Sequence, residues 1–216
     1  MDNKRKKQYI ILGSIIAVIL VIDQVVKIWV KTHLYIGEEI PLIGHWCLLH
    51  FVENEGFAFG MAMGGSTGKI ILSLFRLFAS GGLLWFLLYR IKKGMRTSMV
   101  VCLSLIIVGA LGNLIDSCFY GLIFNESFYN VATLFPAEGG YAPFLQGRVV
   151  DMFYFPIIDT VLPEGFPIWG GKPFVFFNAI FNVADAAITI GAFWLIIDQL
   201  FYTPKNQKNE SEDLEK

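Results

Sequence analysis

Charged side chains are scarce in this chain. Only 16% of its 216 residues are Asp, Glu, Lys or Arg, against about a quarter in a typical soluble domain. The shortage is concentrated in four long apolar runs, which favours an integral membrane protein over a soluble one. The formal net charge is -1, so nothing in the composition indicates a nucleic-acid partner.

Common redox and metal-binding patterns are also missing. The three cysteines form no C-x-x-C pair, and we expect all of them to be unpaired. The three histidines all lie between residues 33 and 50, and no H-E-x-x-H zinc motif is present. We therefore expect neither a metal nor a cofactor, and carboxylates are the best candidates for chemistry.

The four apolar runs are each long enough to cross the roughly 30 Å hydrocarbon core of a bilayer. They predict transmembrane helices over residues 9–30, 70–89, 98–118 and 174–200. The first run follows a basic cluster, as in a secretory signal, but its length and the lack of a small-residue cleavage site favour a retained helix. The expected fold class is an all-α membrane protein with four transmembrane helices.

Basic residues indicate the orientation of these helices. Lys4 to Lys7 precede the first helix, and Arg90 to Arg96 include four basic residues between the second and third. The positive-inside rule places both groups in the cytoplasm, together with both chain termini. Residues 1–201 form a single integral membrane domain in this interpretation, and residues 202–216 a solvated, disordered cytoplasmic tail.

Two long segments remain outside the helices. Residues 31–69 mix short apolar pieces with glycines, which predicts a small extracytoplasmic β structure on the membrane surface. Residues 119–173 are rich in proline and aromatic residues. We expect this second segment to be irregular and interfacial, with no soluble domain of its own.

Asp151 and Asp185 are the strongest functional candidates. Asp185 lies well inside the last apolar run, and Asp151 lies between two hydrophobic blocks. An ionisable group in or beside a membrane segment is costly and is by default a functional-site candidate. Two carboxylates in a partly dry site share one proton, which is the arrangement that an aspartyl hydrolase needs.

Two pairs of polar residues lie within the predicted helices. Asp23 and Lys27 are four residues apart and share one helix face. They form either a structural ion pair or part of a substrate site, and the spacing leaves both possibilities open. Asn113 and Asp116 follow the small residues of 109–112. Helix packing explains the small residues, and an inward-facing polar network is the interpretation that we favour for the pair.

Other polar positions have weaker signals. The spacing of four, three and four residues predicts one polar stripe on the fourth helix, formed by Asn178, Asn182, Asp185 and Thr189. We expect this stripe to face protein or water. Such a stripe also serves as polar glue between helices. Asn54 lies in a segment whose spacing alone favours an ordinary turn over a functional element. Arg148, three residues before Asp151, could bind a carboxylate, a lipid phosphate or only solvent.

Five short elements together resemble the lipoprotein signal peptidase (signal peptidase II) family. In chain order they are Asp23-Gln24-x-x-Lys27, Asn54-x-Gly56-x-Ala58-Phe59, Gly109-x-x-Gly112-Asn113-x-x-Asp116, Val150-Asp151-x-Phe153 and Phe181-Asn182-x-Ala184-Asp185. Each element alone is weak. Their common order on four helices makes the resemblance specific, and it covers residues 9–197.

The resemblance implies an aspartyl endopeptidase of the bacterial inner membrane with its active site towards the outer face. Such enzymes remove the signal peptide from diacylglyceryl-modified prolipoproteins and cut just before the lipidated cysteine. Asp151 and Asp185 match the catalytic pair. Supporting or substrate-contacting positions are matched by Asp23, Lys27, Asn54, Gly56, Gly109, Asn113, Asp116, Asn182 and Ala184. We expect a monomer whose partners are these prolipoproteins and membrane lipids.

The chain departs from the family pattern at three places. Ser117 stands where the family has an arginine, and Arg148 is a candidate replacement for that charge. Met152 replaces a phenylalanine, which is a mild apolar change. The segment 119–173 is unusually long, so the resemblance says nothing about its shape. None of these departures changes Asp151 or Asp185.

A proton-coupled transporter is the rival from another functional class. Its relay would use Asp23, Lys27, Asp116 and Asp185. All four lie towards the outer half of the membrane in the predicted orientation, and no partner in the inner half completes a path. The sequence therefore favours the peptidase. A structural assembly factor has no sequence feature of its own.

Overall fold

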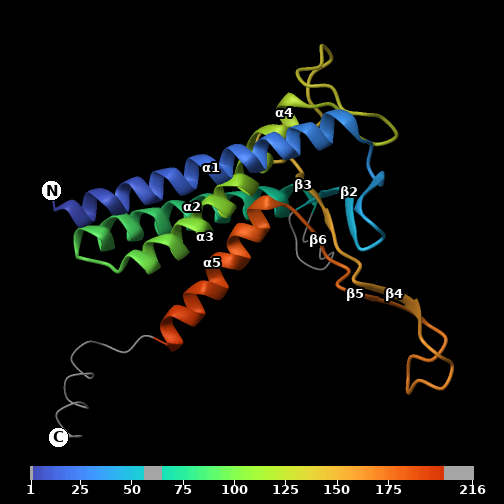
Figure 1. Ribbon diagram of the computed structural model, residues 1–216. Coiled ribbons are helices and arrows are strands. Elements are labelled where there is room, and N and C mark those ends of the chain that lie inside the picture. The colour runs from blue at the N-terminus through green and yellow to red at the C-terminus, as the bar shows by residue number, and fades with distance from the viewer. Residues whose placement is uncertain (1, 56–64, 202–216) are drawn as a thin grey trace, which may run out of the picture.

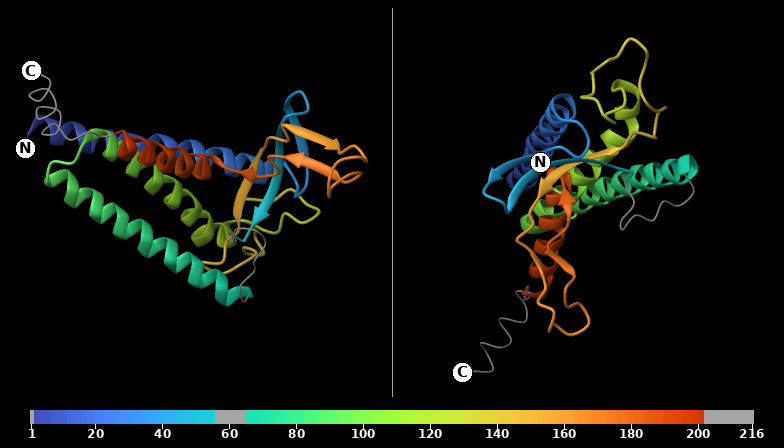
Figure 2. Two further views of the ribbon diagram at one scale, coloured as in Figure 1. Left: turned by 90° about the horizontal axis from the view of Figure 1, so that it is seen from below. Right: turned by 90° about the vertical axis from the view of Figure 1, so that its right-hand side faces the viewer.

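The computed structural model describes residues 2–55 and 65–201. In this part of the chain, four helices are long and apolar enough to cross a membrane, as expected. They are α1 (Asn3–His33), α2 (Gly65–Lys92), α3 with its continuation (Thr97–Ile123) and α5 (Val183–Leu200). Helix α3 packs against the other three. The strands gather at the end of the bundle opposite the N-terminus (Figures 1 and 2).

The third membrane segment changes its winding near its end. Helix α3 is regular over Thr97–Ile115, and a π-helical turn follows over Asp116–Tyr120 before the short α4 (Gly121–Ile123). The sequence predicted a plain helix ending at residue 118. Wide turns of this kind are rare and frequently occur at functional sites. Here the turn displaces Asp116 and Ser117 from the regular helical path.

The predicted start of the fourth helix was wrong. Helix α5 begins at Val183 and not at Phe174, because Pro173–Phe176 form strand β5 and Ile180–Phe181 form strand β6. Aromatic and β-branched residues favour strands, and hydropathy alone cannot separate an apolar strand from an apolar helix. Asn182 is the N-cap of α5.

The correction removes part of the predicted polar stripe. Asn178 lies before the helix, between β5 and β6, where its side-chain oxygen accepts a hydrogen bond from Tyr154 at 3.1 Å. Asn182 caps the helix, and Asp185 and Thr189 are the members that lie within it. The polar stripe within the helix is therefore shorter than predicted: it consists of the N-cap Asn182 followed by Asp185 and Thr189.

A four-stranded antiparallel sheet lies at the end of the bundle opposite the N-terminus. Its order is β1 (Glu39–Ile43), β2 (Cys47–Asn54), β3 (Val149–Tyr154) and β6. The first two strands confirm the small β structure predicted within residues 31–69. Strand β3 comes from the segment predicted to be irregular, and so does β4 (Ile158–Val161), which pairs with β5 in a separate hairpin. That prediction was wrong for these strands.

The sheet is joined to the helices by a hydrophobic core. Phe51 of β2 and Val150 and Met152 of β3 are fully buried, and they pack with Val30 of α1 and Tyr120 of the π-helical turn. Burying such side chains contributes roughly 1.5–3 kcal/mol each. This core holds β3 against the ends of α1 and α3, which determines where Asp151 lies.

Two glycines of α3 allow a close approach of its neighbours. A Cβ atom on Gly109 would lie 2.2 Å from the backbone oxygen of Ala184, and one on Gly112 would lie 2.7 Å from Oδ2 of Asp23. Any larger side chain would push α5 or α1 away. Gly109 thus packs directly against Ala184, and this contact fixes the position of the first turn of α5 relative to α3.

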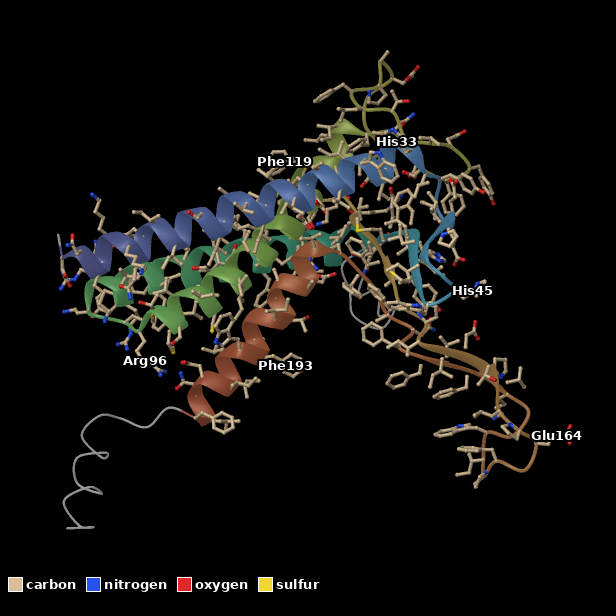
Figure 3. The ribbon with its side chains drawn as sticks, viewed as in Figure 1. His33, His45, Arg96, Phe119, Glu164 and Phe193 are labelled. Carbon is tan, nitrogen blue, oxygen red and sulfur yellow. The ribbon has the colours of Figure 1, made fainter. Side chains whose placement is uncertain are left out.

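The outward surface of the bundle is apolar. Phe75, Phe78 and Trp85 of α2 are exposed, as are Phe193 and Trp194 of α5. Figure 3 shows Phe193 on the outer side of α5. Surfaces of this extent are unfavourable in water and suit contact with lipid. The protein is therefore a multi-pass membrane protein.

Candidate active site

Asp151 lies in the middle of the sheet. Strand β3 is paired with β2 on one side and with β6 on the other, and Asp151 stands opposite Val52. Its side chain is 3% exposed. Oδ2 accepts a hydrogen bond from Nδ2 of Asn54 at 3.2 Å, and Oδ1 accepts one from Nδ2 of Asn182 at 2.6 Å. The carboxyl group is thus buried between two amides.

Asp185 lies in the first turn of α5. The backbone N–H of Asp185 donates to Oδ1 of Asn182 at 2.9 Å, and the N–H of Asn182 donates back to Asp185 Oδ2 at 3.4 Å. This reciprocal pair is a capping box, which explains why the helix starts here. Nδ2 of Asn113 donates to the other carboxylate oxygen of Asp185 at 2.7 Å.

Two amide side chains connect the carboxyl groups. Asn182 donates to Asp151, and it also donates to Oδ1 of Asn113 at 3.1 Å. Asn113 in turn donates to Asp185. Asp151 and Asp185 therefore belong to one hydrogen-bonded array built from a strand, a helix cap and α3.

The two carboxyl groups have different surroundings. Asp151 is buried, whereas Asp185 is half-buried and opens on a pocket of about 400 Å³. The pocket is otherwise lined by Phe177, Ala179, Phe181, Ala186, Thr189 and Ile190. An apolar pocket with one convergent polar group is the usual form of a ligand site.

Burial raises the pKa of Asp151 to about 7, and the nearby charge of Asp185 acts in the same direction. The hydrogen bonds from Asn54 and Asn182 and the charge of Lys27 oppose this shift. Near neutral pH, a substantial fraction of the Asp151 side chains is therefore protonated. A carboxyl group with a raised pKa beside a second carboxylate is the pattern expected for acid–base chemistry.

A buried cation lies behind the two carboxyl groups. Nζ of Lys27 lies 2.9 Å from Oδ2 of Asp23, 2.8 Å from Oδ2 of Asp116 and 2.9 Å from Oδ1 of Asn113. All three donors of the ammonium group are therefore used. Lys27 is 0% exposed and Asp23 1%. Of the two roles left open by the sequence, this geometry favours the structural ion pair.

The carboxylates around Lys27 also hold the backbone beside each catalytic candidate. Oδ1 of Asp23 accepts the N–H of Ala184 at 2.9 Å, one residue before Asp185. Oδ2 of Asp116 accepts the N–H of Val150 at 3.3 Å, one residue before Asp151. The inward-facing polar network predicted for Asn113 and Asp116 is present.

Arg148 does not take the position of the missing family arginine. Its Nη1 lies 2.9 Å from Glu53 and 2.8 Å from Glu126, and its guanidinium group stacks over the ring of Tyr141. The hydrogen bonds to Glu126 raise the pKa of Arg148 further, so the group stays charged. Arg148 belongs to a polar cluster at the start of β3, beside Glu53 of β2.

Sequence reasoning missed a second arginine, Arg76 of α2. Its Nη1 donates to Oγ of Ser117 at 3.3 Å, and its charge interacts with Asp185, Asp116 and Asp151. Arg76 thus brings a positive charge to the position where Ser117 stands. A cation inside an otherwise apolar run was the signal that could have found it.

Several predicted positions cannot be placed. Gly56, with Ala58 and Phe59 of the same motif, lies outside the described residues, and so does the predicted tail 202–216. In the described part of the chain, no group of three or more His, Cys, Asp or Glu side chains is placed to hold a metal ion.

Comparison with known proteins identifies the family. Residues 15–201 match the family model for signal peptidase (SPase) II. The chain belongs to the signal peptidase II family. It is 47% identical to a lipoprotein signal peptidase of Porphyromonas gingivalis over 87% of this chain and 81% of that protein. It is 33% identical to one of Amoebophilus asiaticus, over 83% and 73% of the two chains.

Solved structures agree with this assignment. A bacterial membrane enzyme determined by the in meso method at 2.3 Å resolution is 26% identical, with a TM-score of 0.56, over 88% of this chain and 87% of that one. A second such enzyme, at 1.9 Å resolution, is 27% identical, with a TM-score of 0.55, over 89% and 94%. As a signal peptidase II, the protein is an aspartic protease of the membrane that removes signal peptides from prolipoproteins.

Proposed function

We propose that this enzyme cleaves diacylglyceryl-modified prolipoproteins immediately before the lipidated cysteine, using a water molecule activated by Asp151 and Asp185. One observation carries the proposal. The two carboxyl groups lie in a single hydrogen-bonded array, one buried with a pKa of about 7 and the other opening on an apolar pocket. This asymmetry suits a pair that shares one proton.

The proposed reaction needs only this proton and one water molecule. The ionised carboxylate takes a proton from the water as its oxygen attacks the scissile carbonyl carbon, and the protonated carboxyl donates to the carbonyl oxygen. When the tetrahedral intermediate collapses, the C–N bond breaks and a proton passes to the leaving nitrogen. Asp151, which is the more buried carboxyl, holds the shared proton at rest. Asp185 faces the pocket and acts on the water.

The remaining predicted residues support the pair in this proposal. Asn113 and Asn182 hold the two carboxyl groups, and Asn54 binds the second oxygen of Asp151. Asp23, Lys27 and Asp116 hold the backbone beside them, and Gly109 with Ala184 lets α5 approach α3. These residues orient the reacting groups without contacting the scissile bond.

We further propose that the active site lies at the outer face of the bacterial inner membrane and that both termini are cytoplasmic. Lys4 to Lys7 precede the first span, and Arg90 to Arg96 lie between the second and third, whereas the sheet and the carboxyl pair lie at the opposite end. The positive-inside rule supports this orientation. Residues 1–201 act as one domain, and the enzyme works as a monomer.

Cleavage of a defined substrate tests the proposal. The purified enzyme in lipid bilayers is given a lipobox peptide that carries the diacylglyceryl group, and the same peptide without it. Mass spectrometry of the products reads the cut site. We expect a product that begins at the lipidated cysteine, and much slower cleavage of the unlipidated peptide, which lacks about 0.8 kcal/mol of membrane anchoring per buried CH₂. Equal rates for both peptides would instead indicate a general intramembrane protease.

A further inference from the structure

The β4–β5 hairpin extends away from the rest of the protein as a separate two-stranded sheet (Figures 1 and 3). All four residues of β4 are exposed, as are three of the four residues of β5. A two-stranded hairpin without a packing partner is only marginally stable in water. The hairpin therefore needs a surface that the described part of this chain does not supply.

The exposed side chains of the hairpin are mostly large and apolar. They are Ile157, Ile158, Val161, Phe166, Ile168, Trp169, Phe174, Phe176 and Phe177. Between residues 157 and 177 the charged residues are Asp159, Glu164 and Lys172. At the tip, Ile168 is 85% exposed and has a φ angle of 71°, which a β-branched residue rarely adopts. Exposure of a large apolar side chain to this extent is unfavourable in water.

The register of the hairpin places the aromatic rings of its two strands on one face. Ile158 pairs with Phe176 and Thr160 with Phe174, and directly opposed residues project to the same side of a sheet. We call the face formed by these four residues the aromatic face. The opposite face carries the pairs Asp159–Val175 and Val161–Pro173, so it holds the one charged side chain of the two strands and no aromatic ring. Asp159 and Thr160 are therefore neighbours in sequence that project from opposite faces of the hairpin.

The base of the hairpin continues into the membrane surface of the protein. Phe177 lines the Asp185 pocket together with Ala186 and Ile190 of α5. Ile190, Phe193 and Trp194 then continue as the exposed apolar side of that membrane-spanning helix. Apart from Asp185 itself, the residues that line this pocket are uncharged, so Phe177 joins the apolar side of α5 to the hairpin.

We propose that the β4–β5 hairpin lies in the interfacial zone of the lipid bilayer, with its aromatic face towards the acyl chains and Asp159 towards the headgroups. Trp and Phe are favourable at this depth because their rings tolerate the boundary between water and hydrocarbon. The bilayer supplies the packing surface that the hairpin lacks. The hairpin in turn holds the pocket of Asp185 at the membrane boundary.

Fluorescence quenching in reconstituted bilayers tests this placement. In a background with every native tryptophan changed to Phe (Trp29, Trp46, Trp85, Trp169 and Trp194), one tryptophan is introduced by Thr160→Trp or, as the matched control, by Asp159→Trp. The two positions are adjacent, both exposed and on opposite faces. A variant that keeps Trp194 alone gives the reference signal for lipid contact.

We expect brominated phospholipids to quench Thr160→Trp strongly and aqueous iodide to quench it weakly, with the reverse order for Asp159→Trp. Iodide quenching that is equal and strong at both positions would overturn the proposal. Shielding of Thr160→Trp that is lost on dilution of the protein in lipid would point to a second copy of the chain and would overturn it too. The test does not depend on cleavage, so its failure would leave the peptidase mechanism intact.

Discussion

Asn182 donates a hydrogen bond of 2.6 Å from Nδ2 to Oδ1 of Asp151, while its own side-chain oxygen caps α5 by accepting the N–H of Asp185. The side chain of Asn182 therefore caps the helix that carries Asp185 and also holds the carboxyl group of Asp151. The first turn of α5 and the orientation of Asp151 thus depend on the same amide.

Turnover should fall as the pH rises through about 7. Burial raises the pKa of Asp151 to about 7, so its proton is present below that pH and is lost above it. The hydrogen bond from Asn54 favours the charged form of Asp151 and opposes this shift. Asn54→Ala should thus move the alkaline limb of the kcat profile to higher pH. A limb that stays in place, or moves to lower pH, would contradict the assigned proton.

Lys27→Met should unfold at a much lower temperature than the native enzyme. The change leaves Asp23 and Asp116 as buried carboxylates without their cation, which costs about 3–5 kcal/mol in comparable buried pairs. Thermal unfolding in detergent, followed by tryptophan fluorescence, measures the effect. Lys92→Met, at an exposed helix end, is the control and should unfold like the native enzyme. An unchanged unfolding temperature for Lys27→Met would show that the ion pair is not structural.

Arg76→Gln should lower kcat by about a hundredfold, whereas Arg148→Gln should affect kcat much less. Arg76 interacts with both candidate carboxylates from α2, and a preorganised charge beside reacting groups contributes at about this level. Arg148 pairs with Glu53 and Glu126 at the start of β3. Kinetics on the lipidated peptide compare the two variants. The opposite order would assign the missing family charge to Arg148.

Gly109→Ala should destabilise the protein by about 1–3 kcal/mol and reduce activity, because the added methyl group forces α3 and α5 apart. The same change at Gly81 of α2 meets nothing within 4 Å. Gly81→Ala should therefore be neutral or stabilising by up to about 1 kcal/mol, as expected when a helical glycine is replaced. Thermal unfolding and kcat of the two variants test the contact. Similar unfolding temperatures for both would contradict it.

Much of this architecture could be predicted from the sequence because the bilayer imposes simple rules. Spans of about 20 apolar residues and the cost of an intramembrane carboxylate are enough to locate α1 to α3 and to single out Asp185. Asp151 is singled out in the same way by the hydrophobic blocks on both sides of it, and the five motifs then indicate the family. These local signals needed no knowledge of the packing.

The start of α5 and the role of Arg76 could not be predicted in the same way. Phe174 to Phe177 are as hydrophobic as the residues of a membrane-spanning helix. Only the pairing of β5 with β4 shows that this segment forms a strand. Arg76 donates a hydrogen bond to Ser117, which is 41 residues away in sequence. A charge inside an apolar run marks Arg76 as unusual, but only the tertiary contacts show which groups it faces.

The central claim is that Asp151 and Asp185 together perform the cleavage. Its most direct test is the rate at which Asp151→Asn and Asp185→Asn cleave the lipidated lipobox peptide, with Asp159→Asn on the exposed hairpin as the control. We predict that both site variants fold normally and lose about a thousandfold or more of the native rate, because an amide can neither accept nor share the proton. The control should keep the native rate. Near-native turnover by either site variant would contradict the mechanism.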